Sequence, residues 1–424
     1  MKHRMLIILL SVCLLVGYHG TVTASEVVEL EFWFGENAQF NEAMQAIVDE
    51  FNKANPGIKV NMVAIGGIGG EAYYEKIRTR LAGGMVPDLV NMGTWDAQQF
   101  FVDGGWIQDI REVIGDNVRL QDLDVIPLGK DDCRVGEYWV CMPFRGTAVG
   151  LYMNATHLDD AGVGRTEPAT LADLDVLARK LTIFSPTGQV QRLGWHPVGN
   201  NWGLEWFFSF GGNYFDSSTW QPTFERPENL QALRWINSYG ELYGKTGVHI
   251  NRFRDQTNSM MVDSSTRLNM LINTPDLDFI IAPVPAAAGV ERFSMGWLHG
   301  VAIIKGSKHP KEAAKFLLHI IDPKMQMLWY NMTYIMPVNM TTIREAAIKA
   351  TDPRLRVLFN QLPISRTDPP FTYAPGGMRT IYNNAINKML DKVLTPEAAL
   401  AEMQREASLF YAPFYERAWQ LNWR

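Results

Sequence analysis

The 424-residue chain has few cysteines, no excess of positive charge and, beyond its N-terminus, no long apolar run. Its three cysteines form neither a CxxC redox motif nor the four-ligand pattern of a zinc site. A formal net charge of −6 argues against a basic nucleic-acid-binding face, so no nucleic acid is expected as a partner. No later segment reaches the about 20 uncharged apolar residues that a membrane span needs.

Signature motifs of nucleotide-binding and hydrolytic enzymes are also missing. The glycine-rich segment 66–70 lacks the GxGxxG spacing, and no GxxxxGK[ST] motif occurs. None of the eight histidines lies in an HExxH motif, and there is no GxSxG elbow. The pairs Asp131-Asp132 and Asp159-Asp160 are neighbours in sequence, so their side chains point apart and make poor acid/base couples. The sequence therefore predicts no enzyme, no metal and no cofactor.

The composition that remains is that of a folded globular protein. Hydrophobic residues make up 47% of the chain and charged residues 20%, which argues against disorder. The length predicts two or three domains. Thirteen tryptophans are a high number, and we expect some of them to line a binding site rather than a core.

The N-terminus predicts export. Lys2 and Arg4 precede the uncharged run Met5–Gly17, and a small residue, Ala24, follows at the expected cleavage position. We interpret residues 1–24 as a signal peptide cleaved after Ala24, which places the mature protein in the periplasm. A lipid anchor at Cys13 is the competing interpretation, and the bulky residue before this cysteine and the apolar stretch after it argue against lipidation.

Export leaves two cysteines, Cys133 and Cys141, in an oxidising compartment. Gly136-Glu137 between them suits a hairpin turn, which would bring the two thiols face to face on adjoining strands. A structural cross-hairpin disulfide is favoured over two free buried thiols.

Apolar periodicity predicts an α/β protein. The first part of the mature chain alternates between the two element types, with strands at 27–34, 58–63 and 87–90 and helices at 40–51 and 74–81. This alternation predicts a parallel sheet with helices on its faces. The rest of the chain is predicted to hold strands at 143–154, 278–285 and 300–305, a helix at 310–318, and mostly helix after 341.

Seven segments in chain order carry a further signal: 30–33 with 51–60, 82–90 with 101–110, 136–143 with 151–154, 167–174, 211–216, 282–285 and 305–316. Two of them read Leu30-Glu31-Phe32-Trp33 and Pro87-Asp88-Leu89-Val90. Together they resemble the extracellular solute-binding protein family 1 of ABC importers, which contains maltose- and glycerol-phosphate-binding proteins. Met153 and Thr170-Leu171 depart from the family pattern at packing positions.

The resemblance implies a type II periplasmic-binding-protein fold, with two α/β lobes, a hinge and a ligand cleft between the lobes. We expect one lobe at 25–142 plus 285–337 and the other at 143–284 plus 338–424. The chain would cross between them near 141–148, 278–284 and 335–340. Hinge closure would then bury the ligand.

A sugar site needs aromatic plates for the apolar ring faces and planar groups that hydrogen-bond the hydroxyls. The expected ligand-binding residues are Phe34, Glu36, Trp95, Asp96, Arg145, Trp202, Trp206, Gly212, Trp297, His299, Tyr334 and Arg379.

Position relative to the predicted strands and helices points to these residues. Phe34, Glu36, Trp95 and Asp96 follow predicted strands, whose ends would open onto the cleft. Trp297 and His299 are expected in a loop before the strand at 300, and Trp202 and Trp206 on one side of a helix. Competing interpretations stay open: aromatics four residues apart also suit a core, the two arginines could form surface ion pairs, and His299 could be structural.

The sequence thus predicts a monomeric substrate-binding component of an ABC importer, which captures a mono- to oligosaccharide and delivers it to the membrane permease. A phosphorylated polyol such as glycerol phosphate is the first alternative, because the guanidinium groups of Arg145 and Arg379 suit phosphate. An exported glycoside hydrolase is the alternative from another class. It would need two carboxyl groups about 5–10 Å apart, and no such pair can be named in the sequence.

Overall fold

The computed structural model describes residues 27–65, 71–199, 203–216, 218–369, 371, 372, 374 and 376–420. The signal peptide and Trp202 lie outside these residues. None of the helices in the described part of the chain combines the length and apolar character that crossing a bilayer requires.

The first strands and helices form the parallel unit that the sequence predicts. Strand β1 (Val28–Phe34) lies between β2 (Ile58–Ala64) and β3 (Leu89–Gly93) and is parallel to both. Helices α1 (Ala38–Ala54) and α2 (Glu71–Ala82) connect them. The side chain of Asn37 caps α1 by accepting a hydrogen bond from the backbone of Phe40, and the predicted apolar face of this helix is buried.

Two long strands extend this unit. Strand β13 (Ser294–Ile303) is antiparallel to β3 on one side and to β6 (Met142–Asn154) on the other. The first half of β6 pairs with β13, whereas its second half pairs with β11 (Met260–Ser264) and β12 (Phe279–Ala282). All residues of β6 are buried. The sheet therefore runs in the order β11-β6-β13-β3-β1-β2, and β6 belongs to both of its parts.

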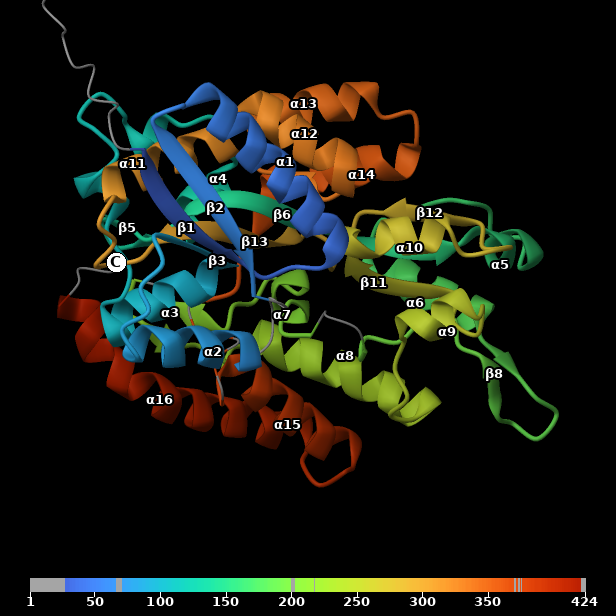
Figure 1. Ribbon diagram of the computed structural model, residues 1–424. Helices are drawn as coiled ribbons and strands as arrows, with labels where there is room; N and C mark the ends of the chain where they lie inside the picture. Colours follow the sequence, from blue (N-terminus) through green and yellow to red (C-terminus); the bar gives the residue numbers. More distant parts are fainter. Residues whose placement is uncertain are drawn as a thin grey trace, which may run out of the picture.

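Helices cover the sheet in layers (Figure 1). Helix α1 packs against α12 (Pro323–Thr333) above the sheet, and α2 and α3 (Thr94–Gly104) lie below it. At the bottom of the view, α8 (Pro227–Tyr243) packs against α15 (Met378–Leu390) and α16 (Pro396–Gln420). The remaining helices are α4 (Pro127–Asp132), α5 (Ala155–Asp160), α6 (Leu171–Leu181), α7 (Trp206–Ser209), α9 (Ile250–Arg254), α10 (Leu268–Ile272), α11 (Pro310–Ile320), α13 (Met340–Lys349) and α14 (Pro353–Gln361).

Short strands and 3-10 turns complete the described chain. The strands are β4 (Arg134–Val135), β5 (Tyr138–Trp139), β7 (Ile183–Phe184), β8 (Val190–Arg192), β9 (Phe215–Asp216), β10 (Gln221–Pro222), β14 (Met336–Pro337) and β15 (Ser365–Arg366). The 3-10 turns are Ile110–Glu112, Leu120–Asp122, Ser265–Arg267 and Leu362–Ile364. After the expected third crossing, α13 packs on α12 and α14 packs on β6 and β12, and the exact lobe boundaries stay a prediction.

One strand begins earlier than the sequence predicts. The strand expected at 300–305 starts at Ser294, so Trp297 and His299 lie inside β13 and not in a loop. The prediction was wrong because Gly296 and Gly300 interrupt the apolar pattern. Both glycines are required by close packing: an added Cβ at Gly296 would lie 2.6 Å from a methyl of Leu128, and one at Gly300 would lie 2.8 Å from the carbonyl oxygen of Met142.

The cysteine hairpin is confirmed. Strands β4 and β5 pair antiparallel around Gly136, which has a φ of 59°. The sulfur atoms of Cys133 and Cys141 lie 2.9 Å apart, and both residues are buried free thiols in this structure. The disulfide itself stays a prediction.

Protein purified from an oxidising compartment should therefore resist alkylation by iodoacetamide after unfolding without a reductant. Reduction should lower the free energy of unfolding by about 2–3 kcal/mol, because the bond closes a short loop of the unfolded chain. Both effects can be measured by mass spectrometry and urea denaturation. Alkylation of both cysteines in the unreduced, unfolded protein would leave the alternative of two free thiols.

Candidate functional site

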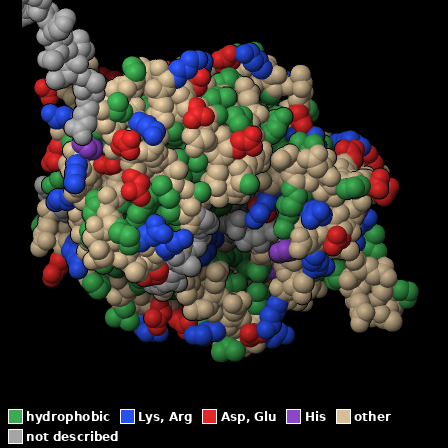
Figure 2. Space-filling view, in the orientation of Figure 1, with side chains coloured by type: hydrophobic (Ala, Val, Ile, Leu, Met, Phe, Trp, Pro, Cys, Tyr) green, Lys and Arg blue, Asp and Glu red, His purple; other side chains and the backbone are tan. Residues whose placement is uncertain are grey.

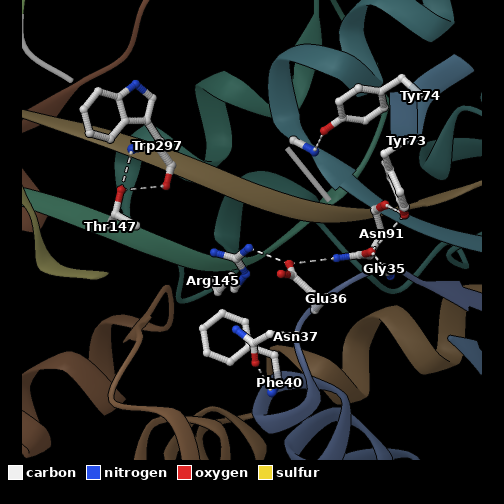
Figure 3. A network of polar contacts seen from close by, with 11 residues as sticks. Gly35, Glu36, Asn37, Phe40, Tyr73, Tyr74, Asn91, Arg145, Thr147 and Trp297 are labelled. Carbon is white, nitrogen blue, oxygen red and sulfur yellow. Dashed lines mark hydrogen bonds and ion pairs between the residues drawn. The ribbon is translucent and has the colours of Figure 1, made fainter. Parts of the chain in front are cut away.

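Two adjacent strands, β6 and β13, form the floor of the candidate site. On β13, Trp297 lies opposite Thr147 of β6, and His299 lies opposite Arg145 of β6. Directly opposed residues of an antiparallel pair point to the same face of the sheet, so these four side chains share one surface. The hydroxyl of Thr147 donates to the carbonyl oxygen of Trp297 and accepts from its backbone N–H, each at 3.3 Å (Figure 3).

An ion pair lies at one end of this floor. The guanidinium of Arg145 is 2.5 Å from the carboxylate of Glu36, which follows β1, and each side chain is only 5% exposed. The side-chain amide of Asn91, on β3, donates to the same carboxylate oxygen at 3.4 Å (Figure 3). The ring of Phe40, in the first turn of α1, lies 5.5 Å from the guanidinium carbon of Arg145. The two charges thus compensate each other beneath an aromatic ring.

The ring of Trp95 borders the floor at His299. The rings of Trp95 and His299 meet edge to face, with centroids 5.5 Å apart. Trp95 belongs to the first turn of α3 and not to a loop, as the sequence suggested. Burial, followed by the positive charge of Arg145, holds the pKa of His299 well below its ordinary value, so the imidazole is neutral at pH 7.

Asp96 does not belong to the floor. Its side chain is buried against Tyr74, and burial raises the pKa of Asp96 to about 7 despite the hydrogen bond from Tyr74. Burial also raises the pKa of Asp132 to about 7, with hydrogen bonds from Thr94 and Thr367 acting in the opposite direction. The ligand role of Asp96 stays a prediction.

A pH dependence of stability follows from Asp96. Its pKa is higher in the folded than in the unfolded state, so its contribution to stability is present below about pH 4 and is lost as the pH rises through 7. Asp96→Asn should raise the free energy of unfolding on the order of 2 kcal/mol at pH 8 and leave it unchanged at pH 4. Urea denaturation at both pH values measures the difference. An equal effect at pH 4 and pH 8 would contradict the raised pKa.

A second polar cluster meets the floor at Trp297. The indole N–H of Trp297 donates to Asp368 at 3.2 Å, and the hydroxyl of Tyr214 donates to the other oxygen of Asp368 at 2.7 Å. Arg379, in the first turn of α15, lies 2.6 Å from Glu205 and 3.8 Å from Asp368. Burial raises the pKa of Glu205, whereas the charge of Arg379 acts in the opposite direction. Arg379 thus compensates carboxylates from two distant parts of the chain.

The structure brings six of the predicted residues into these two clusters. They are Glu36, Trp95, Arg145, Trp297, His299 and Arg379. Tyr334 lies elsewhere, at the left-handed C-terminus of α12, where it is 50% exposed and contacts the ring of Tyr330. Trp202 lies outside the described residues.

Three other predicted residues are in closely packed surroundings. Phe34 is fully buried in the core against Phe32, because the end of β1 is covered on both faces. Trp206 is 1% exposed among other aromatic rings and donates its indole N–H to the carbonyl oxygen of Pro197. At Gly212 an added Cβ would lie 2.0 Å from the side-chain oxygen of Asn229, so packing requires glycine there, and its approach to a ligand stays a prediction.

Several members of the two clusters were not predicted from the sequence: Asn91, Thr147, Glu205, Tyr214 and Asp368. Asn91 could have been found, because a polar residue inside the apolar run of β3 needs a buried partner. Glu205, Tyr214 and Asp368 carry no such signal. Asp368 is 71 residues from Trp297 and 154 from Tyr214 in sequence, and Glu205 is 174 residues from Arg379.

The surface is hollowed on the face drawn in Figure 2, where the layer of α1 lies above that of α7 and α8. Within the described ranges, no group of three His, Cys, Asp or Glu side chains is arranged to hold a metal ion. Half-buried aromatic rings and internally paired charges thus characterise the site.

Known proteins resemble this chain over most of its length. A sequence profile of bacterial extracellular solute-binding proteins matches residues 37–327. The sn-glycerol-3-phosphate-binding periplasmic protein UgpB of Yersinia pestis is 21% identical over 92% of this chain and 94% of its own length.

Solved structures show the same fold. The cyclic alpha-maltosyl-1,6-maltose binding protein of Arthrobacter globiformis has a TM-score of 0.77 at 19% identity, and the alignment covers 90% of this chain and 98% of that one. UgpB of Mycobacterium tuberculosis, in complex with glycerophosphocholine, has a TM-score of 0.77 at 20% identity and covers 91% of this chain and 99% of its own. The expected type II periplasmic-binding-protein fold is confirmed.

Proposed function

The chain belongs to the bacterial extracellular solute-binding protein family, and we propose that it captures a neutral carbohydrate in the periplasm and delivers it to the permease of an ABC importer. The observation that carries this proposal is the floor on which the half-buried ring of Trp297 lies beside Thr147 and the compensated pair Arg145–Glu36. An aromatic plate next to fixed hydrogen-bonding groups suits a ring with an apolar face and a rim of hydroxyls.

The charges favour a carbohydrate over a phosphorylated polyol. A phosphate is best held by a guanidinium that offers it two N–H groups. Arg145 is instead engaged by Glu36, and Arg379 by Glu205 and Asp368. An anionic ligand would have to compete with carboxylates that are themselves buried. Glycerol phosphate is still the compound to compare with carbohydrates, because the Yersinia relative is named for binding it.

Delivery requires that the permease distinguish the loaded from the empty protein. In this proposal, the predicted lobes close on the bound sugar, and the ligand shifts the equilibrium only through contacts that are better in the closed form. The protein acts as a monomer that is released from its signal peptide after Ala24. Binding, and not turnover, is the proposed activity.

A thermal-shift screen tests the proposal. The panel contains mannobiose, mannotriose, maltose, maltotriose, tagatose, glycerol 3-phosphate and glycerophosphocholine. A bound carbohydrate should raise the melting temperature, because at a hundred times its Kd it adds about 2.7 kcal/mol of stability. Stabilisation by the two phosphorylated compounds alone would contradict the proposal. Chromatography of the incubated oligosaccharides would reveal any hydrolysis, which would instead support the hydrolase alternative.

A further inference from the structure

Two nitrogen atoms of the floor find no hydrogen-bond partner in the described part of the chain. They are Nε of Arg145 and Nδ1 of His299, and both atoms are buried although the structure offers neither of them a partner among the described residues. Arg145 is 4% exposed as a whole. Buried polar groups are nearly always hydrogen-bonded in native proteins, so each unpartnered nitrogen calls for an explanation.

The two nitrogens belong to one place in the fold. Arg145 and His299 are directly opposed on β6 and β13, and Cβ atoms of such pairs are about 5 Å apart. The charge of Arg145 also lowers the pKa of His299, which agrees with their proximity. Glu36 holds another nitrogen of the same guanidinium, and Trp95 packs against the imidazole. Both side chains are therefore fixed before any ligand binds.

We propose that Arg145 and His299 together recognise one hydroxyl group of the carbohydrate. The Nε–H of Arg145 donates to the hydroxyl oxygen, and Nδ1 of His299 accepts the hydroxyl hydrogen, with the imidazole proton on Nε2. A hydroxyl is both donor and acceptor and satisfies both nitrogens at once. This inference rests on the proposed function and deepens it by assigning two residues that determine specificity.

The pair also explains how an anion would be rejected. A fully ionised carboxylate or phosphate has no hydrogen for Nδ1, and the site would then bury an acceptor against an acceptor. The burial of His299 and the neighbouring positive charge keep the imidazole neutral, so it does not become a donor near pH 7. A deoxy sugar would leave both nitrogens unsatisfied.

Four variants test the assignment. His299→Leu removes the acceptor, and His299→Asn restores an acceptor oxygen near the position of Nδ1. Arg145→Lys keeps a positive charge beside Glu36 but removes the Nε–H donor. His309→Leu is the matched control, because His309 lies at the start of α11, outside both clusters. Binding of maltotriose, mannotriose and glycerol 3-phosphate is measured by isothermal titration calorimetry, and the unfolding of each unliganded variant is measured alongside.

For whichever trisaccharide the wild-type protein binds, His299→Leu and Arg145→Lys should each weaken binding roughly tenfold. His299→Asn should recover most of the affinity, and His309→Leu should not change it. Because both residues hold the same hydroxyl, the double variant His299→Leu/Arg145→Lys should lose much less affinity than the product of the two single losses. Independent, multiplicative losses would overturn the shared hydroxyl.

The outcomes separate this inference from the proposed function. If His299→Leu bound the trisaccharide as tightly as the wild-type protein does, the inference would be overturned and carbohydrate capture would still stand. Binding of glycerol 3-phosphate alone, or of none of the three probes, would count against carbohydrate capture and so against the inference as well. Loss of the folded state in both His299→Leu and His299→Asn would show that His299 is structural and would also overturn the inference.

Discussion

Trp297→Ala should weaken carbohydrate binding by roughly 30-fold or more while changing the unfolding of the unliganded protein little. Aromatic side chains at the centre of a binding site account for losses of this size when they are truncated. The indole ring is half-buried on β13, and its N–H is fixed by Asp368 at 3.2 Å. Calorimetric titration with the carbohydrate found by the panel, together with urea denaturation, measures both quantities.

Trp206→Ala is the matched control and should show the opposite pattern. Trp206 is 1% exposed, and its ring lies 5.4 Å from that of Trp195 and 5.1 Å from that of Trp235. Removing it should cost about 3–5 kcal/mol of stability through the cavity that it leaves. If Trp297→Ala were equally destabilised and bound the sugar normally once folded, Trp297 would be a core residue.

Arg379→Met should destabilise the protein by about 3–5 kcal/mol, because it leaves the buried carboxylate of Glu205 without its countercharge. Glu205 is fully buried, and Arg379 lies 2.6 Å from it. The pKa of Glu205 is already raised by burial, and loss of Arg379 should raise it further. The destabilisation should therefore be largest at pH 8 and should shrink as the pH falls and the carboxyl group takes up a proton.

The double variant Glu205→Gln/Arg379→Met is the control for this effect. It removes both charges, so most of the lost stability should return and the dependence on pH should become weaker. Urea denaturation of the three proteins at pH 5 and pH 8 gives the comparison. If the single and double variants were equally unstable, Arg379 would act through its packing and not through its charge.

Sequence reasoning succeeded where the pattern is local. The alternation from β1 to β3 could be predicted because each element has its own periodicity and its own end signal, such as Pro56-Gly57 after α1. The same reasoning could not tell that Phe34 is a core residue and Glu36 a site residue, because both lie at the end of the same strand. The end of β1 is buried on both faces, so Phe34 is enclosed, whereas Glu36, two residues further on, reaches the floor.

The position of a tryptophan in the sequence also did not show whether it belongs to the core or to the candidate site. Trp206 lies between Glu205 and Phe207, and Trp297 lies between Gly296 and Leu298, and these neighbours do not reveal that one is in the core and the other in the candidate site. What distinguishes them is the strand register that places Trp297 beside Thr147, and this register is set by pairing between segments 150 residues apart. The contacts of Asp368 with Tyr214 and Trp297 arise in the same way. Local periodicity carries no information on such contacts.

The continuity of β6 limits how the two parts of the molecule can move. Its partner changes from β13 to β11 between Ala148 and Val149, so any closing motion must twist this one strand without breaking it. Gly146 and Gly150 lie on either side of that point, and an added Cβ at either would lie within 2.8 Å of a neighbouring methyl group. A bulkier residue there would stiffen the joint, and ligand affinity would then change at a position that never touches the sugar.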